Sequence, residues 1–496
     1  MTKGAAISPK TSANMKTLFP HFLSLALFLG ASASEAANVT RSGSALTYQG
    51  HTVNLYGATM YPTWTTGGQT LHASAWSNAG FTAYIDQIIP LAIKANFNTV
   101  RVTDFLSGVS AGNWSNATVW ANVDYLMQQA HARGLWVILD LSTYRNYLIN
   151  NNLYAYNSAN WTSFINFVGQ RYANNSAVAY YAIAGEVNAI SSDQSDNSSP
   201  HSTAELTTFY DTVSRQLHSA DGGNHLISTG GLLQLNWNSG IDWQSIFSLT
   251  DIDVPAIHVY SSGDATVTVP NVSSYAASIH KPWFIEEFGE QQSNGDSARA
   301  QFFNDRYALA RQYGSVGAVF WNFGPEVKST SFDVNQSTPL ALAAIVSNGF
   351  TFGVHYFETE NLTVAQNSGD THRVITGSGF SGGEGTILDA NAVGDYVTYL
   401  VPNLGSGSYD VRVGIKKINT RGIWQLTVGA AGNPSTTNVG APCDEYSSSE
   451  VYTEIDFGSW SPASTGDKWY HFTITGKNAA STGYGEAFDY IKLVPQ

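Results

Sequence analysis

The chain has 496 residues, more than one hydrophobic core usually covers, so two domains are expected. Its formal net charge of −14 disfavours nucleic acid and other polyanions as partners, because their binding depends on Lys and Arg replacing counterions. The single cysteine, Cys443, excludes an intrachain disulfide and a cysteine-based metal cluster. These features together favour an uncharged partner.

The N-terminal segment has the pattern of an export signal. Two lysines precede an apolar run at 18–29, and small residues follow at 31–37. We predict a signal peptide at 1–37, cleaved near Ala36 or Ala37, and therefore a secreted protein, extracellular or periplasmic. An uncleaved membrane anchor is the alternative, although the run is short for a bilayer span. No later stretch is long and apolar enough for a membrane helix, so no membrane partner is expected.

Short apolar runs alternate with amphipathic stretches from residue 53 to residue 352, as repeated βα units do. Eight such units favour a closed (β/α)8 TIM barrel over an open doubly wound sheet. No Gly-x-Gly-x-x-Gly follows the first strand, which disfavours a nucleotide-binding fold. We therefore predict an α/β catalytic barrel at 38–352. The predicted strands are 53–56, 99–102, 136–139, 178–183, 225–228, 254–259, 283–285 and 318–321.

Helical spacing of apolar residues appears between several of these strands. Gly134 and Gly314 follow two of the helical segments, where a C-terminal cap is expected. The predicted helices are 81–94, 118–133, 161–172, 203–218 and 297–313.

The pattern changes after residue 352, where helical periodicity gives way to short alternating strands separated by Gly, Ser, Asn and Pro. This is typical of a β-sandwich, and we predict one of jelly-roll type at 353–496. Its predicted strands include 395–401, 409–415, 424–428, 470–475 and 489–494.

Two glutamates stand at the ends of apolar runs in the predicted barrel: Glu186 in AIAGEVN and Glu287 in KPWFIEEFGE. Burying an unpaired carboxylate costs several kcal/mol or shifts its pKa, so packing alone does not account for them. Working residues of such barrels lie where the strands end, at the C-terminal face. Other polar or aromatic side chains at predicted strand ends are Arg101, His258, Tyr260 and Trp321.

This set matches the needs of a retaining glycosidase. One carboxyl attacks the anomeric carbon while the other protonates the departing oxygen, at a separation of about 5–5.5 Å. Each residue alone also has a plainer interpretation: Arg101 as an outer ion-pair partner, His258 as a core histidine, and Tyr260 and Trp321 as rim aromatics. Other acidic residues near strand ends are interpreted as surface or supporting charges, namely Asp104, Asp140, Glu290 and Glu326.

The strand ends resemble those of glycoside hydrolase family 5 over residues 52–352. TVRVTDF resembles the second-strand arginine motif of the family, GLWVILDLS its third strand, AIHVY its His-x-Tyr sixth strand and VFWNFG its eighth-strand tryptophan. The resemblance implies that Glu186 is the acid/base and Glu287 the nucleophile. It further implies that Arg101 and Tyr260 hold the nucleophile, that His258 hydrogen-bonds near the reacting groups, and that Trp321 forms the floor of the subsite.

Strand alternation separates Glu287 from its neighbour Glu286. Trp283, Ile285 and Glu287 are expected to point to one side of the strand, and Phe284 and Glu286 to the other. The Glu-Phe-Gly match to the family selects Glu287 as the residue that faces the barrel axis. Glu286 is then a structural or supporting carboxylate.

Two positions depart from the family pattern. The family has Asn directly before the acid/base, where its amide bonds the sugar 2-hydroxyl, and here that position is Gly185. Asn188 is a nearby substitute only if it can reach the sugar. The usual third-strand histidine is replaced by Ser142. An atypical branch or an altered substrate is the expectation, because both glutamates and their supporting residues are present.

The C-terminal segment opens with HYFETENLTV and closes with AFDYIKLVP, and this pairing resembles carbohydrate-binding modules of families 6 and 35. The resemblance implies a structural calcium ion held by Glu358, Glu360 and Asp489, and oxygen ligands suit this hard cation. A terminal salt-bridge cluster is the alternative. Trp424 alternates in phase with apolar neighbours and is expected in the core. Tyr446, Trp460 and Tyr484 lie in loop-like stretches and are candidates for stacking on sugar rings.

The implied function is a secreted retaining glycoside hydrolase that cleaves a β-linked plant-type polysaccharide. We expect β-1,4-mannan, because KPWFIEEFGE and AIHVY resemble the mannanase branch of the family more than the cellulase branch. A β-1,4-glucanase, a xylanase and an exo-acting glycosidase remain open. A non-catalytic polysaccharide-binding protein is the alternative of another class. No cofactor is expected for catalysis, and the protein is expected to be a monomer.

Overall fold

The computed structural model describes residues 38–48, 51–95, 97–187, 202–233, 241–349, 355–404, 408–433, 437–464 and 466–495. The predicted signal peptide at 1–37, the predicted domain boundary at 352 and Asn188 lie outside the described residues. None of the helices within these ranges is both long enough and apolar enough to cross a membrane.

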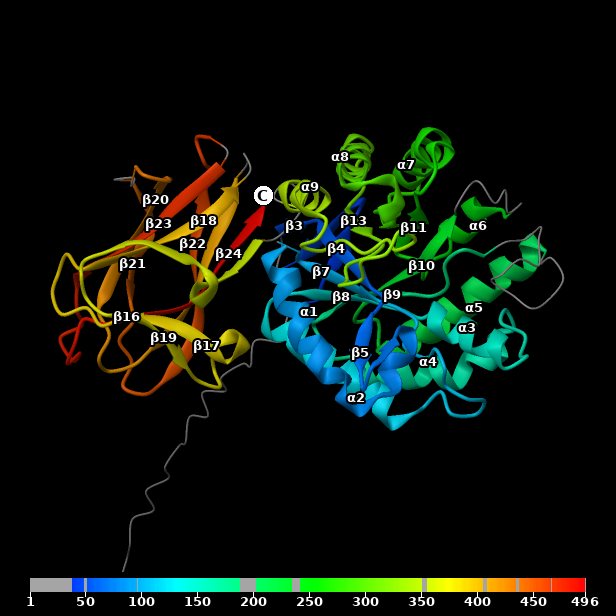
Figure 1. Cartoon of the computed structure of the whole chain (residues 1–496), viewed down its shortest axis with the longest axis horizontal. Coiled ribbons are helices and arrows are strands. Elements are labelled where there is room, and N and C mark those ends of the chain that lie inside the picture. Colours follow the sequence, from blue (N-terminus) through cyan, green and yellow to red (C-terminus); the bar gives the residue numbers. More distant parts are fainter. Residues whose placement is uncertain are drawn as a thin grey trace, which may run out of the picture. The chain divides into compact units, whose positions relative to one another are not determined.

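Eight parallel strands close into a barrel in the order β4-β7-β8-β9-β10-β11-β12-β13 (Figure 1). The predicted (β/α)8 fold is therefore confirmed, and each predicted run overlaps one strand. The strands are β4 (Leu55–Met60), β7 (Thr99–Val102), β8 (Trp136–Asp140), β9 (Val178–Ala182), β10 (Leu226–Leu233), β11 (Val254–His258), β12 (Phe284–Glu287) and β13 (Gly317–Phe320).

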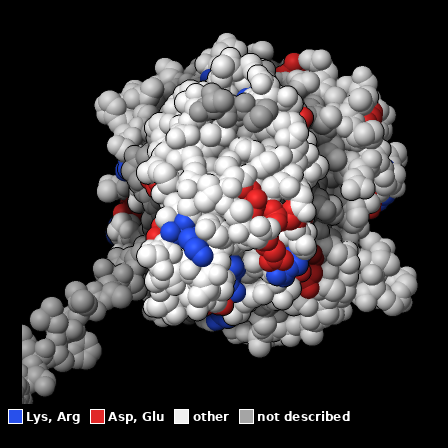
Figure 2. Space-filling view, turned by 90° about the vertical axis from the view of Figure 1, so that its left-hand side faces the viewer, with Lys and Arg blue, Asp and Glu red and all other residues white. Residues whose placement is uncertain are grey.

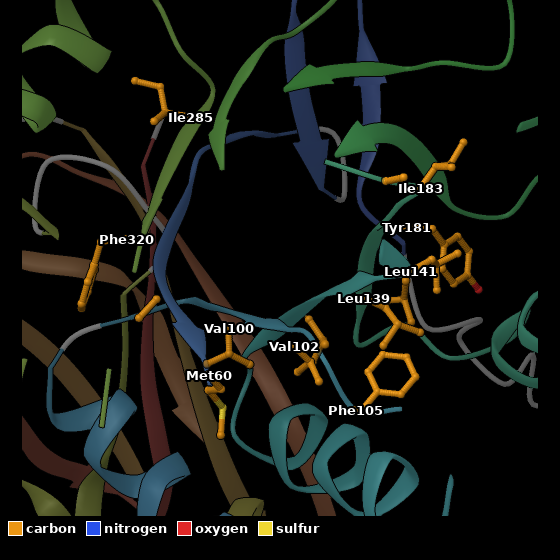
Figure 3. Close-up of a cluster of buried hydrophobic side chains, with 14 of the residues drawn as sticks. Met60, Val100, Val102, Phe105, Leu139, Leu141, Tyr181, Ile183, Ile285 and Phe320 are labelled. Atoms are coloured by element: carbon orange, nitrogen blue, oxygen red, sulfur yellow. The ribbon is translucent and has the colours of Figure 1, made fainter. Parts of the chain in front are cut away.

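Both faces of the barrel wall are buried, which is why its strands read as nearly continuous apolar runs. The outer face packs beneath the helices, and Figure 3 shows part of this cluster, including Val100 and Val102 of β7. Arg101 lies between these two valines in the sequence and points to the other face, where it donates a hydrogen bond to Glu287. The interior is filled by a separate cluster that includes Leu55, Ile138, Tyr180, Ala256, Phe284 and Val319.

Helices alternate with the strands and surround the barrel (Figure 1). The five predicted helices correspond to α1, α2, α4, α5 and α8. Gly134 and Gly314 have φ of 66° and 69°, the left-handed conformation that favours glycine after a helix. The helices are α1 (Thr82–Lys94), α2 (Ala117–Ala132), α3 (Ser142–Asn150), α4 (Ser158–Tyr172), α5 (Thr203–Asp221), α6 (Trp243–Phe247), α7 (Val269–Ser278), α8 (Asp296–Gln312) and α9 (Pro339–Gly349).

Two small sheets accompany the barrel. One has the order β1-β2-β3 and precedes the first barrel strand, and the other is the hairpin β5-β6 that follows it. Their strands are β1 (Thr40–Ser42), β2 (Ala45–Tyr48), β3 (His51–Val53), β5 (Trp64–Thr66) and β6 (Gln69–Leu71).

The C-terminal region forms two antiparallel sheets, which agrees with the predicted β-sandwich. Trp424 from one sheet and Phe488 from the other have ring centroids 5.3 Å apart, and Trp424 is fully buried, as predicted. One sheet contains β16 (His372–Thr376), β17 (Glu384–Leu388), β24 (Glu486–Pro495), β19 (Tyr409–Lys417) and β22 (Val451–Trp460), with β14 (His355–Glu358) paired to β24. The other contains β15 (Thr363–Asn367), β18 (Tyr396–Leu404), β23 (Gly466–Gly476), β20 (Ile423–Ala430) and β21 (Asn438–Asp444).

Candidate active site

Glu186 and Glu287 come together at the C-terminal mouth of the barrel, although about a hundred residues separate them in the sequence. Glu186 lies beyond the end of β9, and Glu287 ends β12. Together with His258 at the end of β11, they present side-chain atoms that all lie within 4.8 Å of one another. This separation is close to the about 5–5.5 Å of a retaining pair and short of the about 6.5–9.5 Å of an inverting pair.

Glu287 is held from two sides. The Tyr260 hydroxyl donates a hydrogen bond to Oε1 at 2.5 Å, and Nη1 of Arg101 donates to Oε2 at 3.1 Å. Both partners stand at strand ends predicted from the sequence. The two donors fix the rotation of the Glu287 carboxylate, and Arg101 is positioned by strand β7 while Tyr260 lies two residues after the end of β11.

Asp140, interpreted from the sequence as a surface or supporting charge, is a buried partner of Arg101. Nη2 of Arg101 donates to Oδ2 of Asp140 at 2.6 Å, and the Thr103 hydroxyl donates to the same oxygen at 2.8 Å. Burial alone would raise the pKa of Asp140, but Arg101 and the hydrogen bonds outweigh it and lower the pKa below its ordinary value. The Arg101 guanidinium is thereby locked between Asp140 and Glu287.

Glu286 also faces the interior, so the expectation that Glu287 alone of the two neighbours faces the barrel axis was wrong. Phe284 belongs to the interior cluster and Ile285 to the outer one. Oε1 of Glu286 accepts a hydrogen bond from the Tyr180 hydroxyl at 3.0 Å, and Oε2 lies 3.9 Å from Nε of Arg101. The pairing of β11 with β12 shifts register next to His258, and this irregularity lets Glu286 and Glu287 both reach Arg101.

The pKa of Glu286 is raised above its ordinary value because its carboxyl is fully buried, and the nearby Arg101 offsets only part of this effect. The neutral form of Glu286 is therefore favoured relative to a carboxyl in water. Glu286 supports the site from below, whereas Glu287 stands at the mouth.

Glu186 is paired with His258. Nδ1 of His258 lies 2.7 Å from Oε1 of Glu186, while Nε2 lies 3.4 Å from Oε2 of Glu287. Burial disfavours ionisation of Glu186, but the hydrogen bond and charge of His258 outweigh it and lower the pKa of Glu186. Burial likewise opposes the cationic form of His258, and the two carboxylates reverse this and raise its pKa.

Trp321 follows β13 directly and is partly exposed. Its ring lies 5.2 Å, centroid to centroid, from that of Tyr61, which follows β4, the neighbouring strand of the barrel. The sequence analysis did not single out Tyr61. A tyrosine directly after a barrel strand is a signal that could have identified it. It was missed because the first barrel strand was expected to end at residue 56 rather than at Met60.

Gly185 sits where the backbone ends of β9 and β10 approach closely. A Cβ atom at this position would lie 3.2 Å from both the nitrogen and the oxygen of Gly231. The amide of Glu186 donates to the Gly231 carbonyl at 2.8 Å. A side chain at position 185 would therefore press against the β10 backbone, and the asparagine of the family pattern does not fit here without movement.

Ser142 begins α3 rather than projecting from a strand end. Its amide donates to Oδ1 of Asp140 at 2.9 Å, so this position helps to orient the carboxylate that holds Arg101.

In the sandwich, Glu358 and Asp489 converge on Ser381. Its hydroxyl donates to Oε1 of Glu358 at 2.7 Å, and its amide donates to Oδ1 of Asp489 at 3.0 Å. Oε2 of Glu358 and Oε2 of Glu360 are buried, and neither accepts a hydrogen bond from the residues that the structure describes. No Lys or Arg among those residues forms an ion pair with the three carboxyls, which disfavours the salt-bridge alternative.

Burial is the largest cause that raises the pKa of all three of these carboxyls. It raises the pKa of Glu360 and of Asp489 to about 7 each, and that of Glu358 well above its ordinary value. Carboxyl oxygens that are buried without a donor fit a hard divalent cation such as calcium.

Comparisons with known proteins agree with the barrel. The family model described as Cellulase (glycosyl hydrolase family 5) matches residues 50–327, more than half of the chain. An endo-1,4-beta-mannanase from Rhizomucor miehei is similar in structure with a TM-score of 0.51 and 18% identity, over 63% of this chain and 99% of that one. At 18% identity, this similarity is evidence for the fold alone.

Two further solved structures are similar to parts of this chain. The hyperthermostable endo-1,4-beta-D-mannanase from Thermotoga petrophila RKU-1 is 17% identical over 60% of this chain and 100% of that one, with a TM-score of 0.47. A xanthan lyase from Paenibacillus is 34% identical over 28% of this chain and 13% of that one, with a TM-score of 0.26. No curated protein sequence matches the chain.

The closed barrel and the family match over more than half of the length lead to one conclusion. The chain belongs to glycosyl hydrolase family 5 and is a glycoside hydrolase, and a polysaccharide is the substrate class that this membership implies.

Proposed function

We propose that this glycoside hydrolase acts with retention of configuration, with Glu287 as the nucleophile and Glu186 as the acid/base. The observation that supports this most is the distance of at most 4.8 Å between a carboxylate oxygen of Glu186 and one of Glu287. That gap accommodates an anomeric carbon and a glycosidic oxygen but leaves little room for the water that an inverting enzyme places there.

In the first step, Glu287 attacks the anomeric carbon and the glycosidic bond breaks. Glu186 gives a proton to the departing oxygen, and a glycosyl ester of Glu287 forms. In the second step, Glu186 takes a proton from water as the water oxygen attacks the same carbon, which releases the sugar and restores the Glu287 carboxylate. Arg101 and Tyr260 hold the Glu287 oxygens throughout both steps.

His258 supports the proton transfers at Glu186. Its Nδ1 atom is within hydrogen-bond distance of the acid/base, so one proton can be carried by either partner. Trp321 and Tyr61 offer apolar ring faces at the mouth, where a sugar ring can stack.

For the polysaccharide we propose β-1,4-mannan, cleaved internally. The support is the resemblance of KPWFIEEFGE and AIHVY to the mannanase branch of the family. β-1,4-glucan and xylan are the alternatives, because the loops around a barrel mouth decide specificity and the same barrel fold occurs with many different specificities. The export-like N-terminal segment supports action outside the cell or in the periplasm.

We assign the sandwich the role of a carbohydrate-binding module that tethers the barrel to its substrate and raises the local concentration. The support is the resemblance of its first and last strands to families 6 and 35. Glu358, Glu360 and Asp489 would hold a structural calcium ion, which neutralises their charge. On the face drawn in Figure 2 most of the surface is uncharged, which suits a neutral polysaccharide better than a polyanion.

A non-catalytic polysaccharide-binding protein is the second candidate, and Gly185 in place of the family asparagine favours it. Hydrolysis of β-mannan, β-glucan and xylan by the full chain separates the two functions. Catalysis requires that wild type cleaves at least one of them and that Glu287→Gln and Glu186→Gln abolish cleavage of the natural polymer.

Glu290→Gln is the matched control, since Glu290 lies after β12 and outside the catalytic pair. NMR of the first-formed anomer then tests the stereochemistry. Retention supports the double displacement, and inversion or binding without cleavage contradicts it.

A further inference from the structure

Arg145 is a buried cation behind the acid/base that the family motifs do not include. It lies in the first turn of α3, the helix that follows β8, and only 8% of its surface is exposed. Its Nη1 atom donates a hydrogen bond to the carbonyl of Gly185, the residue before Glu186. An arginine side chain therefore reaches from a neighbouring βα unit to the backbone that carries the acid/base.

The guanidinium of Arg145 is itself fixed. Nε and Nη2 both donate to Oδ1 of Asn146, at 3.1 and 3.0 Å, and Nδ2 of Asn146 donates to Oδ1 of Asp104 at 2.8 Å. Asp104 lies two residues after the end of β7, the strand that carries Arg101. The hydrogen bond to Gly185 thus connects the acid/base to the same strand that holds the nucleophile's arginine.

The backbone around Glu186 needs such support. Glu186 has φ of 53°, a strained conformation for a non-glycine residue that persists only where surrounding contacts impose it. Gly185 has no Cβ and allows many backbone conformations, so its own side chain cannot impose one. Hydrogen bonds do so instead: the Tyr210 hydroxyl binds the Ala184 carbonyl at 2.5 Å, and the Glu186 amide binds the Gly231 carbonyl.

Arg145 also contributes charge. The titratable and charged groups that face Glu186 from the surrounding elements are His258 on β11, Arg101 on β7, Glu287 on β12, Tyr260 after β11 and Arg145 on α3. Among these groups, Arg145 is the cation that hydrogen-bonds to the backbone next to Glu186. It binds neither the Glu186 nor the Glu287 carboxylate in the structure. Its removal should therefore affect Glu186 while leaving the hold on Glu287 intact.

We propose that Arg145 is a positioning residue for the acid/base step: it fixes the Gly185–Glu186 peptide and so directs the Glu186 carboxyl toward the leaving-group oxygen. This role rests on the proposed function of Glu186. It accounts for how the site works with glycine at position 185, where a side chain would press against the β10 backbone.

The test uses Arg145→Gln in the full chain and a series of aryl β-glycosides of the sugar that wild type cleaves, with leaving groups from methoxyphenol to dinitrophenol. A poor leaving group departs only when it receives a proton from the acid, whereas dinitrophenolate departs without one. The contribution of general acid catalysis, about 10²–10⁴-fold, is therefore seen only with the poor leaving groups. We expect kcat/KM to fall at least about tenfold for the poor leaving groups and less than about threefold for dinitrophenolate. The basic limb of the pH profile should also shift, and Arg145→Lys should recover part of the loss.

Arg299→Gln is the matched control. Arg299 is fully buried and donates to the carbonyls of Glu290, Phe332 and Asp333, but contacts neither catalytic glutamate. It should lower the thermal unfolding temperature without changing the leaving-group dependence. If Arg145→Gln lowers kcat/KM equally for every leaving group, or does not lower it at all, the inference is overturned. If the glutamine variant does not fold, the same comparison is made with Arg145→Lys. Wild type that cleaves no glycoside overturns the proposed function, and the inference with it.

Discussion

Nδ1 of His258 lies 2.7 Å from Oε1 of Glu186, so these two side chains can share a proton. The pKa of Glu186 is lowered and that of His258 is raised, so the contact favours the charged forms of both side chains. The two groups titrate together, and their apparent pKa values belong to the pair.

The pH profile of kcat/KM should therefore follow the histidine on its basic side. A raised histidine pKa means that the proton is fully present below the ordinary value of about 6.5 and is lost as pH rises through the higher, folded-state value. We expect the basic limb of the wild type to lie above pH 6.5. His258→Gln removes this proton, so its basic limb should move to lower pH, and superimposable limbs for the two proteins would contradict the shared-proton account.

Tyr260→Phe removes one of the two donors to Glu287. A hydrogen bond to a charged group contributes about 1.5–3 kcal/mol, so kcat should fall about 10- to 100-fold with little change in the thermal unfolding temperature. Steady-state kinetics on the cleaved polysaccharide measures this. The control is Tyr275→Phe, because the Tyr275 hydroxyl donates to the Gln244 carbonyl at an exposed site. Equal activities of the two variants would show that Tyr260 does not support the nucleophile.

Gly185→Asn should fail to improve the enzyme. The new Cβ would lie 3.2 Å from the Gly231 backbone, and overpacking of this kind costs about 1–3 kcal/mol. We expect a lower unfolding temperature and lower kcat/KM, measured by calorimetry and by hydrolysis assays. A variant that is as stable as wild type and more active would mean that the amide reaches the sugar 2-hydroxyl after all.

Calcium should stabilise the sandwich more strongly at high pH. Because the pKa values of Glu360 and Asp489 are raised to about 7, the folded state binds more protons than the unfolded state between about pH 4 and 7. Metal-free protein should therefore lose stability as pH rises through this window. Added calcium should raise the unfolding temperature at pH 8 and have a smaller effect at pH 5.

Chelation by EDTA should reverse the gain at pH 8, and Glu358→Gln combined with Asp489→Asn should abolish it. Asp370→Asn provides the control, since Asp370 is a partly exposed sandwich residue that pairs with Ser368 and Asn391. An unfolding temperature that is insensitive to calcium in the wild type would exclude this site.

The barrel could be predicted because its strands are buried on both faces and read as uninterrupted apolar runs. The grouping of Arg101, His258 and Tyr260 around the glutamates followed from their shared position at strand ends. The all-round apolar PLALAAIV of α9 gave no helical period, and the short, polar α3 gave no apolar face, so these helices were missed.

Contacts that depend on exact register could not be predicted. Glu286 faces the interior in phase with Phe284, whereas Glu287 reaches the site because the β11–β12 pairing is irregular, and no periodic pattern contains that information. Arg145 lies on α3 and contacts a backbone carbonyl, an interaction without a sequence motif. Asp140 directly precedes Leu141 at a strand end and could have been selected as the second partner of Arg101.

Trapping of the covalent intermediate tests the central claim most directly. A 2-deoxy-2-fluoro glycoside with a good leaving group slows both steps, and peptide mapping by mass spectrometry then locates the attached sugar. The account predicts one fluorosugar per chain, esterified to Glu287, with no label in Glu287→Gln. Attachment to Glu286, or time-dependent turnover with inversion and no attached sugar, would contradict it.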